Sequence, residues 1–101
     1  MKHIQERYIS NLSSRFRNFV KKSKNLYNFS CPYCGDSKAN KSKARGYLLG
    51  NKHGYHYFCH NCSESCSFTQ FMKKYDNTSY LNYVRDVFAE KMYDLMMEEI
   101  R

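Results

Sequence analysis

The sequence predicts a small α+β domain in which a short antiparallel β-sheet carries two cysteine pairs, with a helix on either side of it in the chain. Three observations support this prediction. Within 101 residues, Cys31 and Cys34 form one pair, Cys59 and Cys62 form the other, and 24 residues separate the pairs. Apolar and polar residues alternate beside both pairs, as in β-strands. Apolar residues recur at helical spacing near both ends of the chain.

The first 25 residues are expected to form an N-terminal helical segment, residues 1–25. A helix is predicted over residues 4–20, because apolar residues fall there on one helical face: Ile9, Leu12, Phe16, Phe19 and Val20. The basic stretch 21–25 interrupts this pattern and is expected to be a loop.

The central segment, residues 26–76, is expected to be a zinc ribbon with three strands. These are predicted over residues 26–30, 44–49 and 55–58, with a turn over the glycine-containing stretch 50–54. Gly35 follows the first cysteine pair, where the chain is expected to adopt a positive φ.

The last part of the chain is expected to be helical. Ser67 and Gln70 form a capping-box pattern in front of a short helix that ends near Tyr75. A longer helix should begin near Ser79 and run toward the end, so residues 77–101 form a C-terminal helix. Its apolar face is predicted to consist of Leu81, Val84, Phe88, Met92 and Leu95.

The two Cys-x-x-Cys turns predict one structural metal ion held by Cys31, Cys34, Cys59 and Cys62. Two intervening residues let a tight turn direct both sulfurs at one ion, and four thiolates select zinc or iron over Mg²⁺ or Ca²⁺. A closed shell of four protein ligands is typical of structural rather than catalytic zinc. A redox dithiol, a rubredoxin-like iron site and two disulfides are the alternatives; the polar first residues give no sign of the oxidising compartment that disulfides need. Cys66 is expected to be a free thiol.

The charge distribution is consistent with nucleic-acid binding, and the alternative on charge alone is a solvated basic face without a partner. Residues 1–58 contain 12 Lys and Arg against two acidic residues, whereas residues 59–101 contain five against seven. Basic side chains neutralise phosphates and aromatic rings stack on bases, and both kinds occur together around the predicted hairpin. The expected contact residues are Lys38, Lys41, Lys43, Arg45, Tyr47, Tyr55, His56 and Tyr57. Alternation along the strands predicts that these tyrosines form one surface row with Lys43 and Arg45; the alternative is that Tyr and Leu pack the core.

The sequence contains no catalytic constellation: no nucleophile with a base, no glycine-rich phosphate loop and no acidic cluster for two-metal chemistry. If the chain takes part in catalysis, the reacting groups lie elsewhere. Two non-catalytic alternatives to nucleic-acid binding are a transcription-type zinc ribbon that contacts RNA polymerase, and a scaffold that joins another protein partner. No stretch has the length and apolarity of a membrane span.

Three segments resemble the N-terminal zinc-binding domain of DNA primases from T-even-like tailed phages. They are CPYCGDSK at 31–38, KARGY at 43–47 and YFCHNC at 57–62. The resemblance covers residues 12–85. It implies a zinc ribbon that recognises a short initiation sequence on single-stranded template DNA and supports RNA primer synthesis.

The same resemblance implies a separate catalytic domain that binds Mg²⁺, to which the C-terminal helix would lead; no residue of this chain matches that domain. It further implies the replicative hexameric helicase and single-stranded DNA-binding protein as partners, and the cytoplasm of the host cell as the location.

Overall fold

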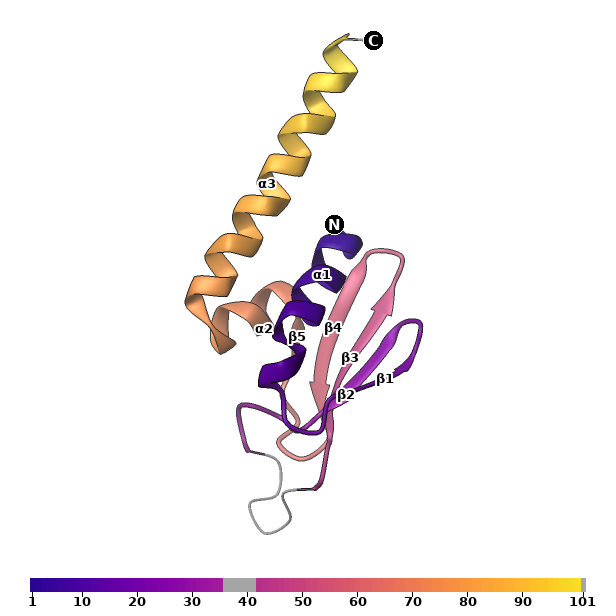
Figure 1. Cartoon of the computed structure of the whole chain (residues 1–101), viewed down its shortest axis with the longest axis vertical. Helices are drawn as coiled ribbons and strands as arrows, with labels where there is room; N and C mark the ends of the chain where they lie inside the picture. Colours follow the sequence, from indigo (N-terminus) through magenta and orange to yellow (C-terminus); the bar gives the residue numbers. More distant parts are fainter. Residues whose placement is uncertain (36–41, 101) are drawn as a thin grey trace.

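The computed structural model describes residues 1–35 and 42–100 and shows a five-stranded antiparallel sheet with helices on one side (Figure 1). This confirms the predicted small α+β class. The strands lie in the order in which they occur in the chain: β1 Val20–Ser23, β2 Leu26–Phe29, β3 Gly46–Asn51, β4 Gly54–Cys59 and β5 Ser65–Ser67. The helices are α1 Lys2–Leu12, α2 Phe68–Tyr75 and α3 Asn77–Ile100.

The predicted helix over residues 4–20 is wrong in its second half. Helix α1 ends at Leu12, a single 3-10 turn follows, and Val20 begins strand β1. The Ser13 hydroxyl donates to the Ser10 carbonyl (2.8 Å), and the backbone is already extended at Phe16, with a ψ of 126°. Asn18, with a φ of 59°, lies between Phe16 and β1. The apolar periodicity suggested a continuous helix because Phe16 is indeed buried in the core. Its backbone, however, is not helical.

The basic stretch predicted as a loop forms most of β1 and its turn into β2. Strand β1 pairs with β2 and is an edge strand of the sheet, with exposed Lys21 and Lys22. Lysines on an edge strand oppose pairing with another chain, so the sheet ends there rather than extending. The predicted boundary at residue 25 falls within this hairpin and stays a prediction.

Strands β3 and β4 form the central hairpin, and their register decides which side chains face the helices. Leu48 lies opposite Tyr57, and Gly46 lies opposite Cys59. A Cβ atom at Gly46 would stand 2.7 Å from the Tyr57 hydroxyl oxygen, so only glycine leaves room for this tyrosine. Strand β5, which was not predicted, pairs Cys66 with Tyr57 on the other side of β4.

The core between the sheet and the helices is mainly aromatic. Phe71 from α2 is fully buried and packs against Phe29 and Tyr57 of the sheet, with ring centroids 6.1 and 4.5 Å apart. Phe16 stacks on Phe29 at 4.3 Å and also lies against Phe71, with ring centroids 6.1 Å apart. Large rings let a chain of this size bury enough apolar surface with few residues.

Helix α2 begins as predicted, since the Ser67 hydroxyl accepts a hydrogen bond from the Gln70 backbone N–H (3.2 Å). Helix α3 begins at Asn77, two residues earlier than expected. Its first half is held to α2 and to α1 by the buried Tyr83, whose hydroxyl accepts a hydrogen bond from Gln5 Nε2 (3.0 Å).

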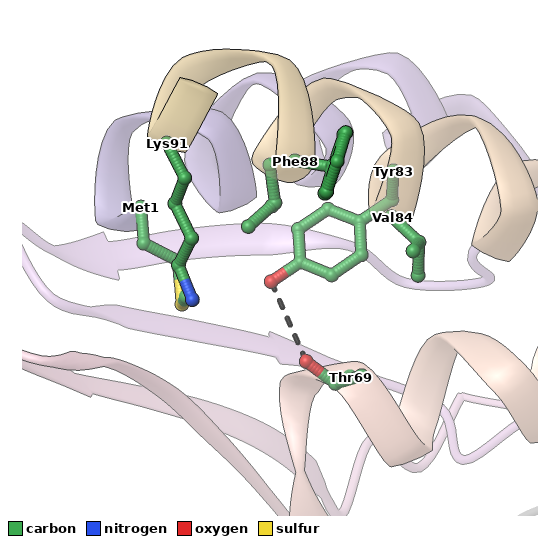
Figure 2. A pocket seen from close by; sticks show the side chains of 7 residues that line it. Met1, Thr69, Tyr83, Val84, Phe88 and Lys91 are labelled. Atoms are coloured by element: carbon green, nitrogen blue, oxygen red, sulfur yellow. Dashed lines mark hydrogen bonds between the residues drawn. The ribbon is translucent and has the colours of Figure 1, made fainter. Parts of the chain in front are cut away.

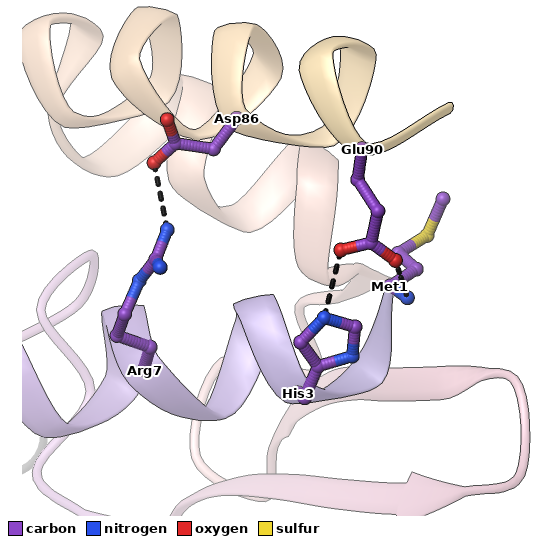
Figure 3. Close-up of polar contacts among 5 residues, drawn as sticks. All are labelled: Met1, His3, Arg7, Asp86 and Glu90. Atoms are coloured by element: carbon purple, nitrogen blue, oxygen red, sulfur yellow. Dashed lines mark hydrogen bonds and ion pairs between the residues drawn. The ribbon is translucent and has the colours of Figure 1, made fainter. Parts of the chain in front are cut away.

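Polar contacts also join α1 to α3 (Figure 3). Arg7 Nη2 donates to Asp86 Oδ2 (2.9 Å), and His3 Nε2 lies 2.7 Å from Glu90 Oε2. Beyond Glu90, α3 extends away from the rest of the molecule (Figure 1). The predicted apolar face of α3 is largely exposed both before and after Glu90: Leu81, Val84, Phe88, Met92 and Leu95.

Candidate metal centre and nucleic-acid interface

The four cysteines of the two Cys-x-x-Cys turns lie together, with all sulfurs within 4.8 Å of one another. Cys31 Sγ is 3.9 Å from Cys62 Sγ, and Cys34 Sγ is 3.9 Å from Cys59 Sγ. A disulfide would need about 2.05 Å. Four sulfurs bound tetrahedrally at about 2.3 Å from one ion would be about 3.8 Å apart, so the observed spacing suits a single metal ion.

The backbone around both turns has the same shape. The residue after the second cysteine of each pair has a positive φ: 72° at Gly35, as predicted, and 63° at Ser63, which the sequence did not reveal. This shape turns backbone N–H groups toward the first sulfur; the Asn61 N–H donates to Cys59 Sγ at 3.3 Å. Such donors stabilise thiolates, which are the metal-binding form of cysteine.

Burial works in the opposite direction at the same site. It raises the pKa of the Cys31 thiol, and it raises that of Cys59 to about 12, although backbone N–H groups from the same turns lower both. Thiols in such surroundings lose their protons readily only when a cation takes their place. The donor set, two fully buried sulfurs and two more accessible ones, therefore suits a bound divalent metal ion.

A buried tyrosine hydroxyl supports this interpretation. Tyr57 is fully buried, and its hydroxyl has no hydrogen-bond partner that satisfies the usual geometric limits among the described residues. It lies beside Cys31, and donation from it would lower the pKa of that thiol. A metal-bound thiolate at Cys31 would accept this hydrogen bond, which gives the buried hydroxyl the partner that it otherwise lacks.

Cys66 lies outside the four-sulfur cluster and forms no disulfide, as predicted. It is buried in β5, and burial raises the pKa of its thiol. Among residues 1–35 and 42–100, the four-cysteine cluster is the one group of three or more metal-ligating side chains close enough to share an ion.

The basic segment 43–45 runs directly beside the metal centre. The Ser30 hydroxyl donates to the Lys43 carbonyl (2.5 Å), and Asn28 Nδ2 donates to the carbonyls on either side of Arg45, those of Ala44 and Gly46 (2.9 and 3.0 Å). The His60 backbone N–H donates to the Arg45 carbonyl (3.0 Å) from the second cysteine turn. The segment is therefore fixed on both sides, whereas Lys38 and Lys41 lie outside the described residues.

The predicted surface row of tyrosines is wrong. Tyr55 is 4% exposed and Tyr57 is fully buried, because both point from β4 toward the helices. Tyr47 lies opposite Phe58 in the register, on the other face of the sheet. The alternative, that the tyrosines pack the core, is correct for Tyr55 and Tyr57. Alternation assigns residues to one face of a strand but does not say which face is buried.

The outer face of the sheet carries a different aromatic set, in which the sequence analysis named Tyr47 and His56 but not Phe58. Tyr47, Phe58 and the predicted His56 share this face with His60, and the His60 ring packs edge-on against Tyr47 (5.3 Å) and Phe58 (4.7 Å). With Leu26 and Leu49 they line a shallow, mainly apolar hollow of about 410 Å³. The sequence contained a signal for this set. If Cys59 faces inward to bind a metal, then Phe58 and His60, its neighbours along the strand, face outward.

A second hollow, which no cysteine lines, lies beside the middle of α3 (Figure 2). It measures about 220 Å³ and is lined mainly by apolar side chains of α3, with Met1 and Thr69 opposite. The Tyr83 hydroxyl lies 3.5 Å from the Thr69 hydroxyl across it. Its lining holds no His, Cys, Asp or Glu, and its polar side-chain groups are the Lys91 amine and the two hydroxyls, so it suits apolar contact rather than metal binding.

Comparison with known proteins shows a similarity to a DNA primase. Over 63 residues, which are 62% of this chain, the sequence is 33% identical to the DNA primase of Enterobacteria phage T4. This chain is similar to part of a phage DNA primase. The match confirms the resemblance seen in the sequence, and the four-cysteine cluster fits a zinc-binding domain.

The aligned segment covers 18% of the T4 primase, so most of that protein has no counterpart in this chain. No family model matches the chain. In the part that the structure describes, no helix has both the length and the apolar character needed to cross a bilayer.

Proposed function

We propose that this chain is the zinc-binding, template-recognition module of a phage DNA primase, which binds a short initiation sequence on single-stranded DNA and supports RNA primer synthesis. The observation that carries the proposal is the position of the basic segment 43–45. It lies between a four-cysteine metal centre and an outer sheet face with clustered aromatic rings. The similarity to a DNA primase supports the same conclusion.

The metal is proposed to be zinc, held by the four cysteines, with a structural role. When bound, it stabilises the two turns that fix β4 and the basic segment. The chain's own residues would then contact DNA: Lys43 and Arg45 would meet phosphates or base edges, and Tyr47, Phe58 and His60 would stack on bases. An arginine that pairs with guanine edges supplies base preference, which stacking alone does not.

The remaining roles of a primase are proposed to lie outside the residues of this chain. We propose that primer synthesis takes place in a separate catalytic domain that binds Mg²⁺, and that helicase and single-stranded DNA-binding protein act as further partners in the host cytoplasm. The exposed apolar face of α3 favours a protein partner as a second activity of this module.

The test is binding of the zinc-loaded chain to a panel of short single-stranded DNAs at two salt concentrations, with a chelated sample as the control. Phe58→Ala should weaken binding by about 1–3 kcal/mol if its ring stacks on a base. Phe88→Ala, a matched change of an exposed phenylalanine on α3, should leave DNA binding unchanged. Equal effects of the two changes would exclude the outer sheet face as the binding surface.

The basic residues separate two kinds of contact. Arg45→Ala should weaken binding mainly to the preferred sequence, whereas Lys43→Ala should weaken binding to all sequences and lower the salt dependence by about one phosphate contact. Equal losses for all sequences from both changes would remove sequence readout from the proposal. Weak, sequence-independent binding by the unaltered chain would favour the transcription-type or scaffold alternative, in which the partner is a protein.

A further inference from the structure

The Asn61 side chain lies between the metal centre and the basic segment. Its Nδ2 is 3.4 Å from Cys34 Sγ, and its Oδ1 accepts a hydrogen bond from Arg45 Nη1 at 2.7 Å. A single amide group thus contacts a sulfur that is positioned to bind the metal and a guanidinium 16 residues away in the chain.

The chemistry of the two neighbours fixes the orientation of this amide. A guanidinium has only donors and therefore needs the amide oxygen, whereas a thiolate has only acceptor capacity and needs the amide NH₂. The reverse orientation would place two donors together at Arg45 and two acceptors together at Cys34. Only one of the two amide orientations satisfies both neighbours, so the two contacts form or fail together.

The backbone of Asn61 belongs to the second cysteine turn. Its N–H donates to Cys59 Sγ at 3.3 Å, and the preceding residue, His60, donates its N–H to the Arg45 carbonyl at 3.0 Å. The amide is therefore carried by the loop that the metal organises, while Arg45 is held to the same loop at its backbone and at its side chain.

We propose that Asn61 is a positioning residue that couples the metal centre to Arg45, so that metal loading fixes the direction of the guanidinium that reads DNA. The role in DNA reading rests on the function proposed above; the coupling between metal and Arg45 does not. Because such coupling is reciprocal, a ligand that holds Arg45 in this position also strengthens metal binding by the same factor.

Groups that hydrogen-bond metal ligands change metal affinity by about 10- to 100-fold when they are removed. Asn61 is exposed to solvent, which can replace part of a lost hydrogen bond. We therefore expect Asn61→Ala to lower zinc affinity by about 10-fold, at the lower end of that range, as measured by competition with a chromophoric chelator. Asn25→Ala is the matched control, since it removes an asparagine oxygen that accepts from Lys2 Nζ (2.7 Å) far from the cysteines.

Asn61→Asp separates the two contacts. A carboxylate still accepts from Arg45 but cannot donate to Cys34, so zinc affinity should fall while Arg45 stays ordered. The order of Arg45 is measured in the zinc-loaded chain by the heteronuclear NOE of its Nε–H group in NMR. This signal should drop in Asn61→Ala and remain in both Asn61→Asp and Asn25→Ala.

DNA binding supplies the last measurement. If Asn61 acts through Arg45, Asn61→Ala and Arg45→Ala should reduce sequence preference by similar factors, and the double change should reduce it no further. Additive losses, or an unchanged Arg45 signal and zinc affinity in Asn61→Ala, would overturn the proposal. If the unaltered chain shows no sequence preference, the proposed function fails, and the NMR and zinc measurements still decide whether Asn61 couples the metal to Arg45.

Discussion

Replacing Tyr57 by phenylalanine tests the metal centre at an atom that does not touch the metal. The change removes one buried oxygen and leaves the ring in place against Phe71. Burial, together with the neighbouring Cys31, raises the pKa of the Tyr57 hydroxyl far above its ordinary range, so this group remains a donor. Its role depends on the protonation state of Cys31.

The expected magnitude follows from that role. With the metal bound, Cys31 is a thiolate and the hydroxyl donates to it; a hydrogen bond to a charged group contributes about 1.5–3 kcal/mol. Tyr57→Phe should therefore lower zinc affinity by about 10- to 150-fold. Without metal the hydroxyl lacks an ordinary partner, so its removal should not destabilise the metal-free chain.

The assay is chelator competition for zinc, combined with thermal unfolding of the loaded protein. Tyr83→Phe is the matched control: it removes another buried hydroxyl, which accepts from Gln5, at a site on α3. This control should cost about 1 kcal/mol of stability without a change in zinc affinity. Equal or higher zinc affinity in Tyr57→Phe would show that the hydroxyl does not bond a metal-bound thiolate, and would refute the reasoning.

Three further predictions concern the fold. Phe71→Ala should destabilise the zinc-loaded chain by about 3–5 kcal/mol in urea unfolding, because it removes a fully buried ring; a loss below 1 kcal/mol would contradict the core described here. Gly46→Ala should cost about 1–3 kcal/mol by overpacking against Tyr57, and an unchanged melting temperature would argue against this close approach. The Tyr8 hydroxyl lowers the pKa of Asp86, so this carboxylate stabilises the fold above its ordinary pKa and the contribution disappears as the pH falls through the lower, folded value. Asp86→Asn should therefore speed hydrogen exchange in α3 at pH 6, and the difference from the unaltered chain should shrink as the pH falls below the ordinary pKa of the carboxyl; equal exchange at pH 6 would exclude this contact as a support of α3.

Local patterns in the sequence predicted the parts of the fold that depend on short spacings. The cysteine turns, the positive φ of Gly35 and the Ser67 cap each involve residues within four positions of one another, and the structure has all three. The helix over residues 4–20 failed for a related reason. Apolar periodicity reports which residues are buried, and Phe16 is buried, but its side chain reaches the core from extended backbone after the 3-10 turn rather than from a helix.

The candidate DNA-binding surface could not be predicted completely from such patterns. Strand alternation assigned Tyr47 to one face of its strand, and Tyr55 and Tyr57 to one face of the next strand. Whether each face is buried or exposed depends on where the helices pack, and they cover Tyr55 and Tyr57. The basic residues Lys43 and Arg45 were selected from their charge. Phe58 was not selected, because nothing in its local sequence distinguishes an outer-face ring from a core ring.

The sequence by itself determined the donor set of the metal centre, the α+β class and the basic character of the segment that follows the first cysteine pair. These follow from residue type and short spacing, which act through local backbone geometry. Only the tertiary structure decided which face of the sheet is exposed, how α1 and α3 pair, and that Asn61 joins Cys34 to Arg45. Those contacts connect residues that are far apart in the chain, and strand register together with competition for one shared core sets them, so no local pattern specifies them.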